Sequence, residues 1–144
     1  MKRIFIDTNV ILDFLADRAP FSEHAAILFQ LANEGKIELY ISAISINNTY
    51  YILRKVASHK IAIQLISDLE ELVGLQETTR GIIRKALKSN FSDFEDAIQY
   101  FSAVQLGNVD IITTRDLKGF KKSDLPVLSP ETTVKLLFKE DKSL

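Results

Sequence analysis

Apolar and polar positions follow two different periods along the chain, and the changes of period predict the order of strands and helices. Short apolar runs rich in β-branched residues are typical of buried strands, whereas apolar residues at three- and four-residue steps are typical of amphipathic helices. The predicted strands cover 4–6, 37–42, 74–76, 109–113 and 127–128. The predicted helices cover 10–16, 20–32, 43–57, 60–72, 79–88, 92–106, 114–120 and 130–138.

Strands and helices alternate in this pattern, with connections long enough to cross from one strand to a parallel neighbour. Such an order indicates the α/β class, with a parallel sheet covered by helices on both faces. The chain of 144 residues has no internal repeat and no long Pro, Gly or Ser tract. We therefore predict a single domain over 1–138, followed by a flexible tail over 139–144.

Composition narrows the chemistry that this domain can perform. The chain is 47% hydrophobic and 26% charged. Its apolar runs are shorter than the roughly 18 residues of a membrane span, and the first is too short for a signal peptide, so we expect a cytoplasmic protein without membrane contact. Zero cysteines exclude thiol nucleophiles, and two scattered histidines disfavour a histidine metal site. A net charge of −1 gives no overall preference for nucleic acid.

Four aspartates follow strand ends or begin a helix. Asp7 directly follows the first strand, and Asp116 follows a later one. Asp93 and Asp96 lie at the start of a helix. The carboxyl ends of parallel strands meet at one edge of the sheet, where ligands bind in open α/β folds. We therefore expect these four side chains to converge.

The helix over 92–106 has a well-marked start. Ser92 fits the N-cap of a capping box in which Glu95 reaches back to it. At about 100° per residue, Asp93 and Asp96 fall at one edge of the apolar stripe of this helix, whereas Glu95 points away from it. We therefore include Asp93 and Asp96 in the candidate site and leave Glu95 out.

The clustered carboxylates predict a metal site. Like charges repel one another and lose solvation, so a group of three or four is commonly held together by a divalent cation. Oxygen ligands without His or Cys favour Mg²⁺ or Mn²⁺, and such an ion suits phosphodiester hydrolysis. A simpler explanation exists for Asp93 or Asp116 alone, because acids in a first helical turn are stabilised by about 0.3–1 kcal/mol. It fits Asp7 less well, since Thr8 and Asn9 could already cap the helix that follows.

Four short segments, in this order and spacing, resemble the PIN-domain proteins, which include the VapC-type toxins of bacterial toxin–antitoxin pairs. The segments are 5–11 (Phe-Ile-Asp-Thr-Asn-Val-Ile), 41–43 (Ile-Ser-Ala), 93–97 (Asp-Phe-Glu-Asp-Ala) and 112–116 (Ile-Thr-Thr-Arg-Asp), followed by Phe120. The resemblance implies a metal-dependent ribonuclease on a three-layer α/β/α sandwich with about five short parallel strands. It also implies that Asp7, Asp96 and Asp116 are metal-site residues. Asp93 would be a further acid of the branch that has the Asp-Phe-Glu-Asp pattern.

The helix after the second strand departs from the family pattern. Many members have a glutamate at the position that Asn48 occupies here. An amide oxygen can bind Mg²⁺ or hold a water on the ion, but it brings no charge, so metal affinity should fall. Alternatively, Asn48 is a buried amide that satisfies backbone groups. An active enzyme and a catalytically weakened or inactive RNA- or protein-binding module are therefore both open hypotheses.

The leading hypothesis is a Mg²⁺- or Mn²⁺-dependent endoribonuclease, a hydrolase with RNA as substrate. Three of the aspartates would hold the ion, and Asp93 would tune it or orient the attacking water. Supporting hydrogen bonds would come from Asn9, Asn48 and Thr114. A phosphatase with Asp7 as nucleophile is less well supported, because position 9 is not an acid and no Gly-rich phosphate loop occurs.

Cations that could hold an RNA backbone occur in local clusters. The candidates for phosphate contact are Arg54, Arg84, Lys88 and Lys118. A solvated helix face or a favourable helix C-terminus is the commoner explanation for such residues. If the resemblance holds, the partners are an antitoxin protein that blocks the acidic cleft and a second copy of the chain in a homodimer.

Overall fold

Five short strands build one parallel sheet, as the alternating sequence pattern predicts. In spatial order the strands are β3 (Gly74–Gln76), β2 (Ile37–Ser42), β1 (Lys2–Ile6), β4 (Ile111–Thr113) and β5 (Val127–Leu128). Every pair of neighbours is parallel, so each connection returns the chain to the same end of the sheet. The structure is a computed structural model, and it describes residues 1–141 and 144.

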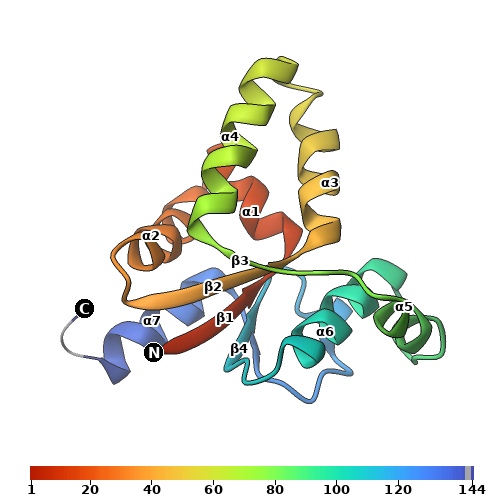
Figure 1. The fold of residues 1–144 in the computed structure, drawn as a ribbon. Coiled ribbons are helices and arrows are strands. Elements are labelled where there is room, and N and C mark those ends of the chain that lie inside the picture. Colours follow the sequence, from red (N-terminus) through yellow and green to blue (C-terminus); the bar gives the residue numbers. More distant parts are fainter. Residues whose placement is uncertain (142–143) are drawn as a thin grey trace.

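Helices make most of the connections and cover both faces of the sheet (Figure 1). They are α1 (Thr8–Leu15), α2 (Ser22–Asn33), α3 (Ala43–Leu53), α4 (His59–Leu72), α5 (Arg80–Leu87), α6 (Phe94–Leu106), the 3-10 helix η1 (Lys118–Phe120) and α7 (Pro130–Glu140). The α/β fold class predicted from the sequence is therefore confirmed.

Most helix ends differ from the prediction by one or two residues, and three differences affect the description of the chain. α3 stops at Leu53 rather than at residue 57, and only η1 is helical within the segment 114–120. α7 continues to Glu140, so the first two residues of the predicted tail belong to a helix. Residues 142–143 of that tail lie outside the described residues. Apolar spacing specifies the middle of a helix better than its ends, because the last turn depends on caps and local contacts.

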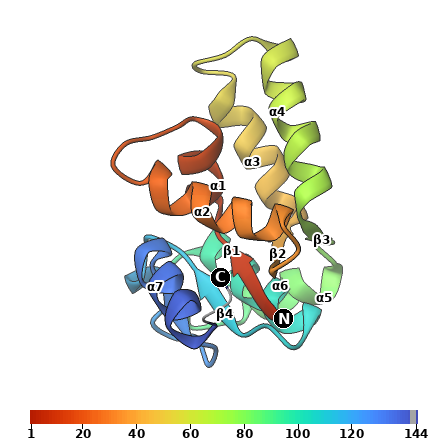
Figure 2. The same ribbon diagram turned by 90° about the vertical axis from the view of Figure 1, so that its left-hand side faces the viewer.

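The two faces of the sheet enter separate hydrophobic cores. Ile4 and Ile6 of β1 pack into a core shared with α1, α2 and α7. Phe5 lies between them in sequence and points to the opposite face, where it packs with Tyr100 of α6 and Phe120 of η1. Successive strand residues alternate between faces, so one short strand anchors both layers. The result is the predicted three-layer α/β/α sandwich (Figures 1 and 2).

α3 and α4 extend away from the sheet as a helical hairpin (Figures 1 and 2). Its outer half is held by a small core of Leu12 from α1, Leu53 from the end of α3 and Ala62 from the first turn of α4. In the same half, Tyr51 is 66% exposed and Val56 is 78% exposed. No helix in the described part of the chain is long and apolar enough to cross a membrane.

The register of β1 and β4 positions the first candidate acid. Ile6 lies opposite Thr113, and the Asp7 backbone N–H donates to the Thr113 carbonyl at 3.0 Å. The Thr114 N–H donates in turn to the Leu128 carbonyl at 3.0 Å. These bonds continue the ladder one residue past the strands. Asp7 and Thr114 therefore lie side by side at the carboxyl edge of the sheet.

Candidate active site

One pocket of about 400 Å³ at the carboxyl edge of the sheet collects the candidate acids. Its walls come from α1, the loop after α1, the end of α3, the start of α6 and the turn after β4. The acids that line it are Asp7, Asp93, Glu95, Asp96 and Asp116. We call it the acidic pocket. The four predicted aspartates all lie in it, although more than a hundred residues separate the first from the last.

Asp7 is held in one position at the end of β1. Its carboxylate is the N-cap of α1, because the Thr8 backbone N–H donates to Oδ1 at 2.7 Å. The Thr114 hydroxyl donates to Oδ2 at 2.8 Å, and the Asn9 side-chain amide donates to the same oxygen at 3.2 Å. The hypothesis that Thr8 or Asn9 caps α1 in place of Asp7 is therefore wrong.

Burial controls the charge state of Asp7, which is 5% exposed. Loss of solvation raises its pKa from 3.8 to about 6, against hydrogen bonds from Thr114 and Thr8 that favour the charged form. The nearby carboxylates of Glu95 and Asp116 raise the pKa further. Asp7 is thus held rigidly in a place where its negative charge is costly.

Asp116 and Asp96 approach each other beside Gly119 of η1. The Gly119 N–H donates to Asp116 Oδ1 at 3.1 Å, and the Asp116 N–H donates to the Thr114 hydroxyl at 3.0 Å. A Cβ on Gly119 would overlap Oδ2 of Asp96 and would lie 2.6 Å from Oδ2 of Asp116. Only glycine leaves room for both carboxylates. Sequence analysis missed Gly119, whose one signal is its place three residues after Asp116.

Asp96 is half-buried and faces carboxylates from two other segments and from its own helix start. Its pKa is raised from 3.8 to about 7, first by desolvation and then by repulsion from Asp7, Asp93, Asp116 and Glu95. Two of the aspartates therefore have raised pKa values, and like-charge repulsion contributes to both. The acidic pocket has more negative charge than its own side chains can compensate.

Asp93, and not Ser92, caps α6. Asp93 Oδ1 accepts a hydrogen bond from the Asp96 backbone N–H at 2.9 Å, and the helix begins at Phe94. The predicted capping box is therefore wrong by one residue. Aspartate and serine are about equally good N-caps, so the sequence alone could not choose between the neighbours. Asp93 has a structural task as well as a place in the pocket, and its catalytic role stays a prediction.

The prediction that Glu95 points away from the site is also wrong. The Asn48 side-chain amide donates to Glu95 Oε1 at 2.9 Å, and Glu95 lines the acidic pocket. The prediction considered only the apolar face of α6. Because Asn48 on α3 reaches the first turn of α6, the polar side of that turn is also a wall of the site. Asn48 thus binds a carboxylate, whereas the alternative interpretation expected it to satisfy backbone groups.

The cations that line the acidic pocket are Arg18 and Arg115, which sequence analysis did not select. Both bind Asp13, a fully buried residue of α1. Arg115 Nε is 2.6 Å from Asp13 Oδ2, and Arg18 Nη2 is 3.0 Å from Oδ1. Their charge is therefore directed mainly to Asp13. The position of Arg115, directly before Asp116, was a visible signal, but Arg18 had none.

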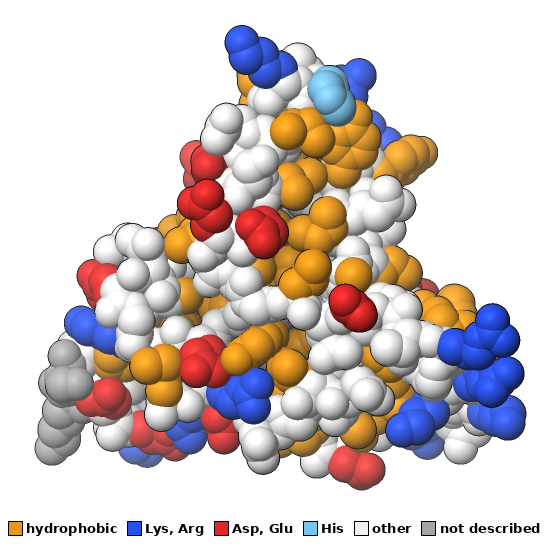
Figure 3. Space-filling view, viewed as in Figure 1, with side chains coloured by type: hydrophobic (Ala, Val, Ile, Leu, Met, Phe, Trp, Pro, Cys, Tyr) orange, Lys and Arg blue, Asp and Glu red, His pale blue; other side chains and the backbone are white. Residues whose placement is uncertain are grey.

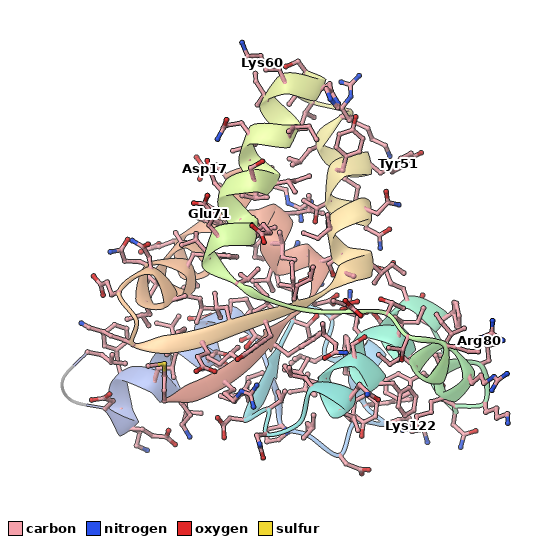
Figure 4. The ribbon with its side chains drawn as sticks, viewed as in Figure 1. Asp17, Tyr51, Lys60, Glu71, Arg80 and Lys122 are labelled. Atoms are coloured by element: carbon pink, nitrogen blue, oxygen red, sulfur yellow. The ribbon has the colours of Figure 1, made fainter. Side chains whose placement is uncertain are left out.

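The cations predicted to contact RNA lie outside the acidic pocket. They are all exposed: Arg54 after α3, Arg84 and Lys88 at α5, and Lys118 on η1. Lys and Arg side chains gather over α5 in Figure 3, and Figure 4 places Arg80 and Lys122 on the same side of the molecule. RNA contact at these positions stays a prediction.

The acids of the pocket do not form a closed set of metal ligands. Across residues 1–141 and 144, no group of three or more His, Asp or Glu side chains is arranged so that it could hold a metal ion. The structure thus brings the predicted ligands into one pocket without assembling them around a common point. The metal-binding roles of Asp7, Asp96 and Asp116 stay predictions.

Comparison with known proteins identifies the class to which this fold and pocket belong. A model of the PIN-domain family matches residues 3–118, a stretch that contains every acid of the acidic pocket. The chain therefore belongs to the PIN-domain family, as the resemblance in its sequence predicts.

Individual relatives extend this result. The chain is similar to Ribonuclease VapC1 of Aquifex aeolicus (strain VF5), with 29% identity over 138 residues that cover 90% of this chain and 92% of the relative. A DNA-bound VapBC from Salmonella typhimurium matches with a TM-score of 0.67 and 17% identity, over 90% of this chain and 99% of that chain. VapC20 from Mycobacterium tuberculosis, a sarcin–ricin loop cleaving toxin, matches with a TM-score of 0.59 and 16% identity, over 76% and 86%. At such identities the two structural matches support the fold.

Proposed function

We propose that this protein is an endoribonuclease that depends on Mg²⁺ or Mn²⁺ and acts as the toxin of a toxin–antitoxin pair. The observation that carries the proposal is the meeting of Asp7, Asp96 and Asp116 in the acidic pocket. Similarity to a protein named Ribonuclease VapC1, and to a toxin that cleaves the sarcin–ricin loop, supports RNA as the substrate.

The donor chemistry of the pocket fits a hard divalent cation. Its acids offer only carboxylate oxygens, which Mg²⁺ and Mn²⁺ prefer, and its two arginines already bind Asp13. The raised pKa values of Asp7 and Asp96 are the electrostatic cost that a bound cation would remove. The side chains of Asp96 and Asp116 each rotate about two single bonds, so their carboxylates could close on an ion beside the fixed carboxylate of Asp7 without movement of the backbone.

Each polar residue of the site has a task in this proposal. Asp7, Asp96 and Asp116 would hold the ion, which when bound would supply a nucleophilic water and offset the charge of the phosphodiester. Thr114 donates its hydroxyl to Asp7 and accepts the N–H of Asp116, so it aligns two of the ligands at once. Asn9 gives Asp7 a second hydrogen bond.

Asn48 and Glu95 account for the departure from the family pattern. Asn48 stands where many members have a glutamate, and its amide holds the carboxylate of Glu95 at the pocket. In our proposal Glu95 supplies from α6 the negative charge that other members supply from α3. Asp93 would orient a water with the carboxylate oxygen that does not cap α6.

Cleavage of a labelled single-stranded RNA tests the enzyme. With Mn²⁺ or Mg²⁺ we expect cleavage that EDTA abolishes, and we expect Asp7→Asn to reduce it by more than about 100-fold, since even outer ligands of metal sites contribute about 10–100-fold. Asp17→Asn, in the exposed loop after α1, is the matched control and should cleave like the wild type.

Two outcomes would count against the enzyme. Equal cleavage by wild type and Asp7→Asn would identify a contaminating nuclease, and absence of cleavage with every divalent ion would support a non-catalytic binding module. Metal binding has a readout of its own: Mn²⁺ should raise the Tm of the wild type and should raise that of Asp7→Asn less, because a ligand of the folded state stabilises it by mass action.

Protein partners complete the proposal. The structural matches include VapBC complexes, which supports an antitoxin partner for this chain.

The α3–α4 hairpin exposes Tyr51, Val56 and Ile61, and apolar side chains are prominent on this part of the surface in Figure 3. A continuous exposed apolar surface is typical of an interface. We propose that this hairpin forms a homodimer, so light scattering should give about twice the chain mass of 16.3 kDa, and Val56→Glu should give the monomer mass.

A further inference from the structure

We propose that Arg18 and Arg115 form a phosphate-binding site at the mouth of the acidic pocket, and that the buried carboxylate of Asp13 positions both guanidinium groups for it. The ligand is a phosphodiester of the RNA strand beside the bond that is cut. The inference therefore rests on the proposed function and adds to it the cationic groups that hold the substrate.

Asp13 is a buried acid that the proposed chemistry does not use. It is fully buried, and its Oδ1 accepts from Arg18 Nε at 3.0 Å and from Arg115 Nη2 at 3.0 Å. Its Oδ2 accepts from Arg115 Nε at 2.6 Å. A buried charge needs a partner, but one arginine would be enough. The second arginine leaves the group of Asp13, Arg18 and Arg115 with one net positive charge. The other charged residues of the adjacent pocket are all acids.

Two further contacts fix the position of Arg115. Its guanidinium carbon lies 3.9 Å from the centroid of the Phe21 ring, and its backbone N–H donates to Asn9 Oδ1 at 3.3 Å. Arg18 is tied to the same residue, since its Nη2 donates to the Asn9 carbonyl at 3.2 Å. Arg18 and Phe21 both come from the loop between α1 and α2, which projects above α7 in Figure 2. Both guanidinium groups are thus ordered before a ligand arrives, which lowers the entropic cost of binding.

Each guanidinium group keeps a donor that the protein does not use. Among the described residues, Nη1 of Arg18 and Nη1 of Arg115 have no hydrogen-bond partner. The two side chains are 39% and 29% exposed, so these donors are accessible to a ligand. Both residues line the acidic pocket together with the aspartates. Arginine donors bind phosphate oxygens through short, charge-assisted hydrogen bonds.

Phosphate is the ligand that this placement favours. The acids of the pocket repel an approaching polyanion, and the cations predicted from the sequence lie outside it. Arg18 and Arg115 are the only positive groups that line the pocket within the described residues. A strand whose reacting phosphodiester lies at the acids therefore meets these two arginines at the same opening, where they offset part of the repulsion.

Salt-dependent binding tests the site. Fluorescence anisotropy with a labelled single-stranded RNA is measured on Asp7→Asn protein, which should not cleave, between about 50 and 200 mM KCl. Adding Arg115→Ala should weaken binding about tenfold and reduce the slope of log Kd against log salt by about one, since one phosphate contact is lost. Arg115→Lys should recover part of the affinity. Lys135→Ala on α7 removes the same charge from an exposed position and should leave the slope unchanged.

Asp13→Asn tests the positioning role on protein that otherwise has the wild-type sequence. We expect the KM for RNA to rise about tenfold and the salt slope to fall, while kcat changes by less than about threefold, because the arginines lose their anchor and the acids keep theirs. A purely structural role would lower the folded fraction, and therefore kcat, and would leave the KM and the slope unchanged. If Asp13→Asn does not fold, Arg18→Ala replaces it and should lower the slope by itself.

The outcomes separate this inference from the proposed function. A slope for Arg115→Ala equal to that of Lys135→Ala would overturn the phosphate site, even if the wild type cleaves RNA. Arg115-dependent binding by a wild type that cleaves no RNA with Mg²⁺ or Mn²⁺ would overturn the proposed function and leave the phosphate site standing.

Discussion

Acidic side chains have different neighbours at the two edges of the central sheet. At the amino edge, acids are paired with cations: Lys2 Nζ is 3.2 Å from Glu140 Oε2, and Arg3 Nε is 3.4 Å from Glu38 Oε2. Asp110 Oδ2 accepts the Arg3 backbone N–H at 2.8 Å. These are exposed or partly exposed contacts that an ordinary folded surface contains.

At the carboxyl edge, carboxylates gather beside one another and the pocket's arginines bind a different acid, Asp13. The pKa values of Asp7 and Asp96 rise to about 6 and about 7 as a result of burial and repulsion. Such an arrangement lowers the stability of the folded state, and sites of function are where a fold retains such costs. The comparison therefore teaches that the carboxyl edge retains negative charge without a local partner, as the proposed cation site requires, whereas the amino edge pairs its charges.

The largest expected difference in activity between the two edges comes from replacing one aspartate at each of them. Asp96→Asn should lower RNA cleavage by more than about 100-fold, as for a lost metal ligand. Without divalent ions it should nevertheless raise the Tm by roughly 3 °C, because a half-buried, partly screened repulsion is worth about 1 kcal/mol. Asp110→Asn at the amino edge should leave cleavage unchanged. Cleavage assays and thermal denaturation in EDTA measure both quantities, and a destabilised Asp96→Asn would contradict the comparison.

Gly119→Ala should have the next largest effect. The added Cβ would displace the carboxylates of Asp96 and Asp116, and misplacement of reacting groups by about 1 Å can cost about 100-fold in rate. Gly81→Ala on α5 is the matched control, since its Cβ would meet nothing closer than Thr79 Oγ1 at 3.8 Å. The control should keep full activity and gain about 0.5–1 kcal/mol of helix stability. Equal activities of the two variants would show that Gly119 does not shape the site.

The pH dependence of stability gives a smaller effect, with a definite sign. In the folded protein the pKa values of Asp7 and Asp96 are about 6 and about 7, against 3.8 for ordinary aspartate. Between pH 3.8 and about 7 the folded state binds more protons than the unfolded state, so these two groups make stability fall as pH rises. Asp7 contributes to both proteins alike, so wild type and Asp96→Asn should have nearly equal Tm values near pH 4 and should diverge toward pH 7. Parallel curves in EDTA would contradict this assignment.

The smallest effect belongs to the amino edge. Lys2→Ala should change the free energy of unfolding by less than about 0.5 kcal/mol, because both partners of the Lys2–Glu140 pair are exposed to solvent and screened by salt. Urea denaturation of the variant and the wild type at low and high salt measures this change. A loss of several kcal/mol would mean that the amino edge depends on its ion pairs more than exposed pairs normally allow.

The sequence by itself determined the order of the elements and the position of the first acid. Short apolar strands and amphipathic helices differ in period, so 4–6, 37–42 and 109–113 could be assigned as strands of one parallel sheet. A parallel sheet places the carboxyl ends of its strands together, and Asp7 and Asp116 were expected near each other for this reason alone. Both inferences use only local periodicity and topology.

Only the tertiary structure decided which side chains share the site and what each one contacts. Glu95 faces Asn48, and Asp13 binds an arginine 102 residues away. Gly119 matters because carboxylates from two other places in the chain lie against it. These contacts depend on the packing of α3 and η1 against α6 and of α1 against the turn after β4. A pattern of residue types along one chain does not encode such distances, since they arise when segments remote in sequence pack together.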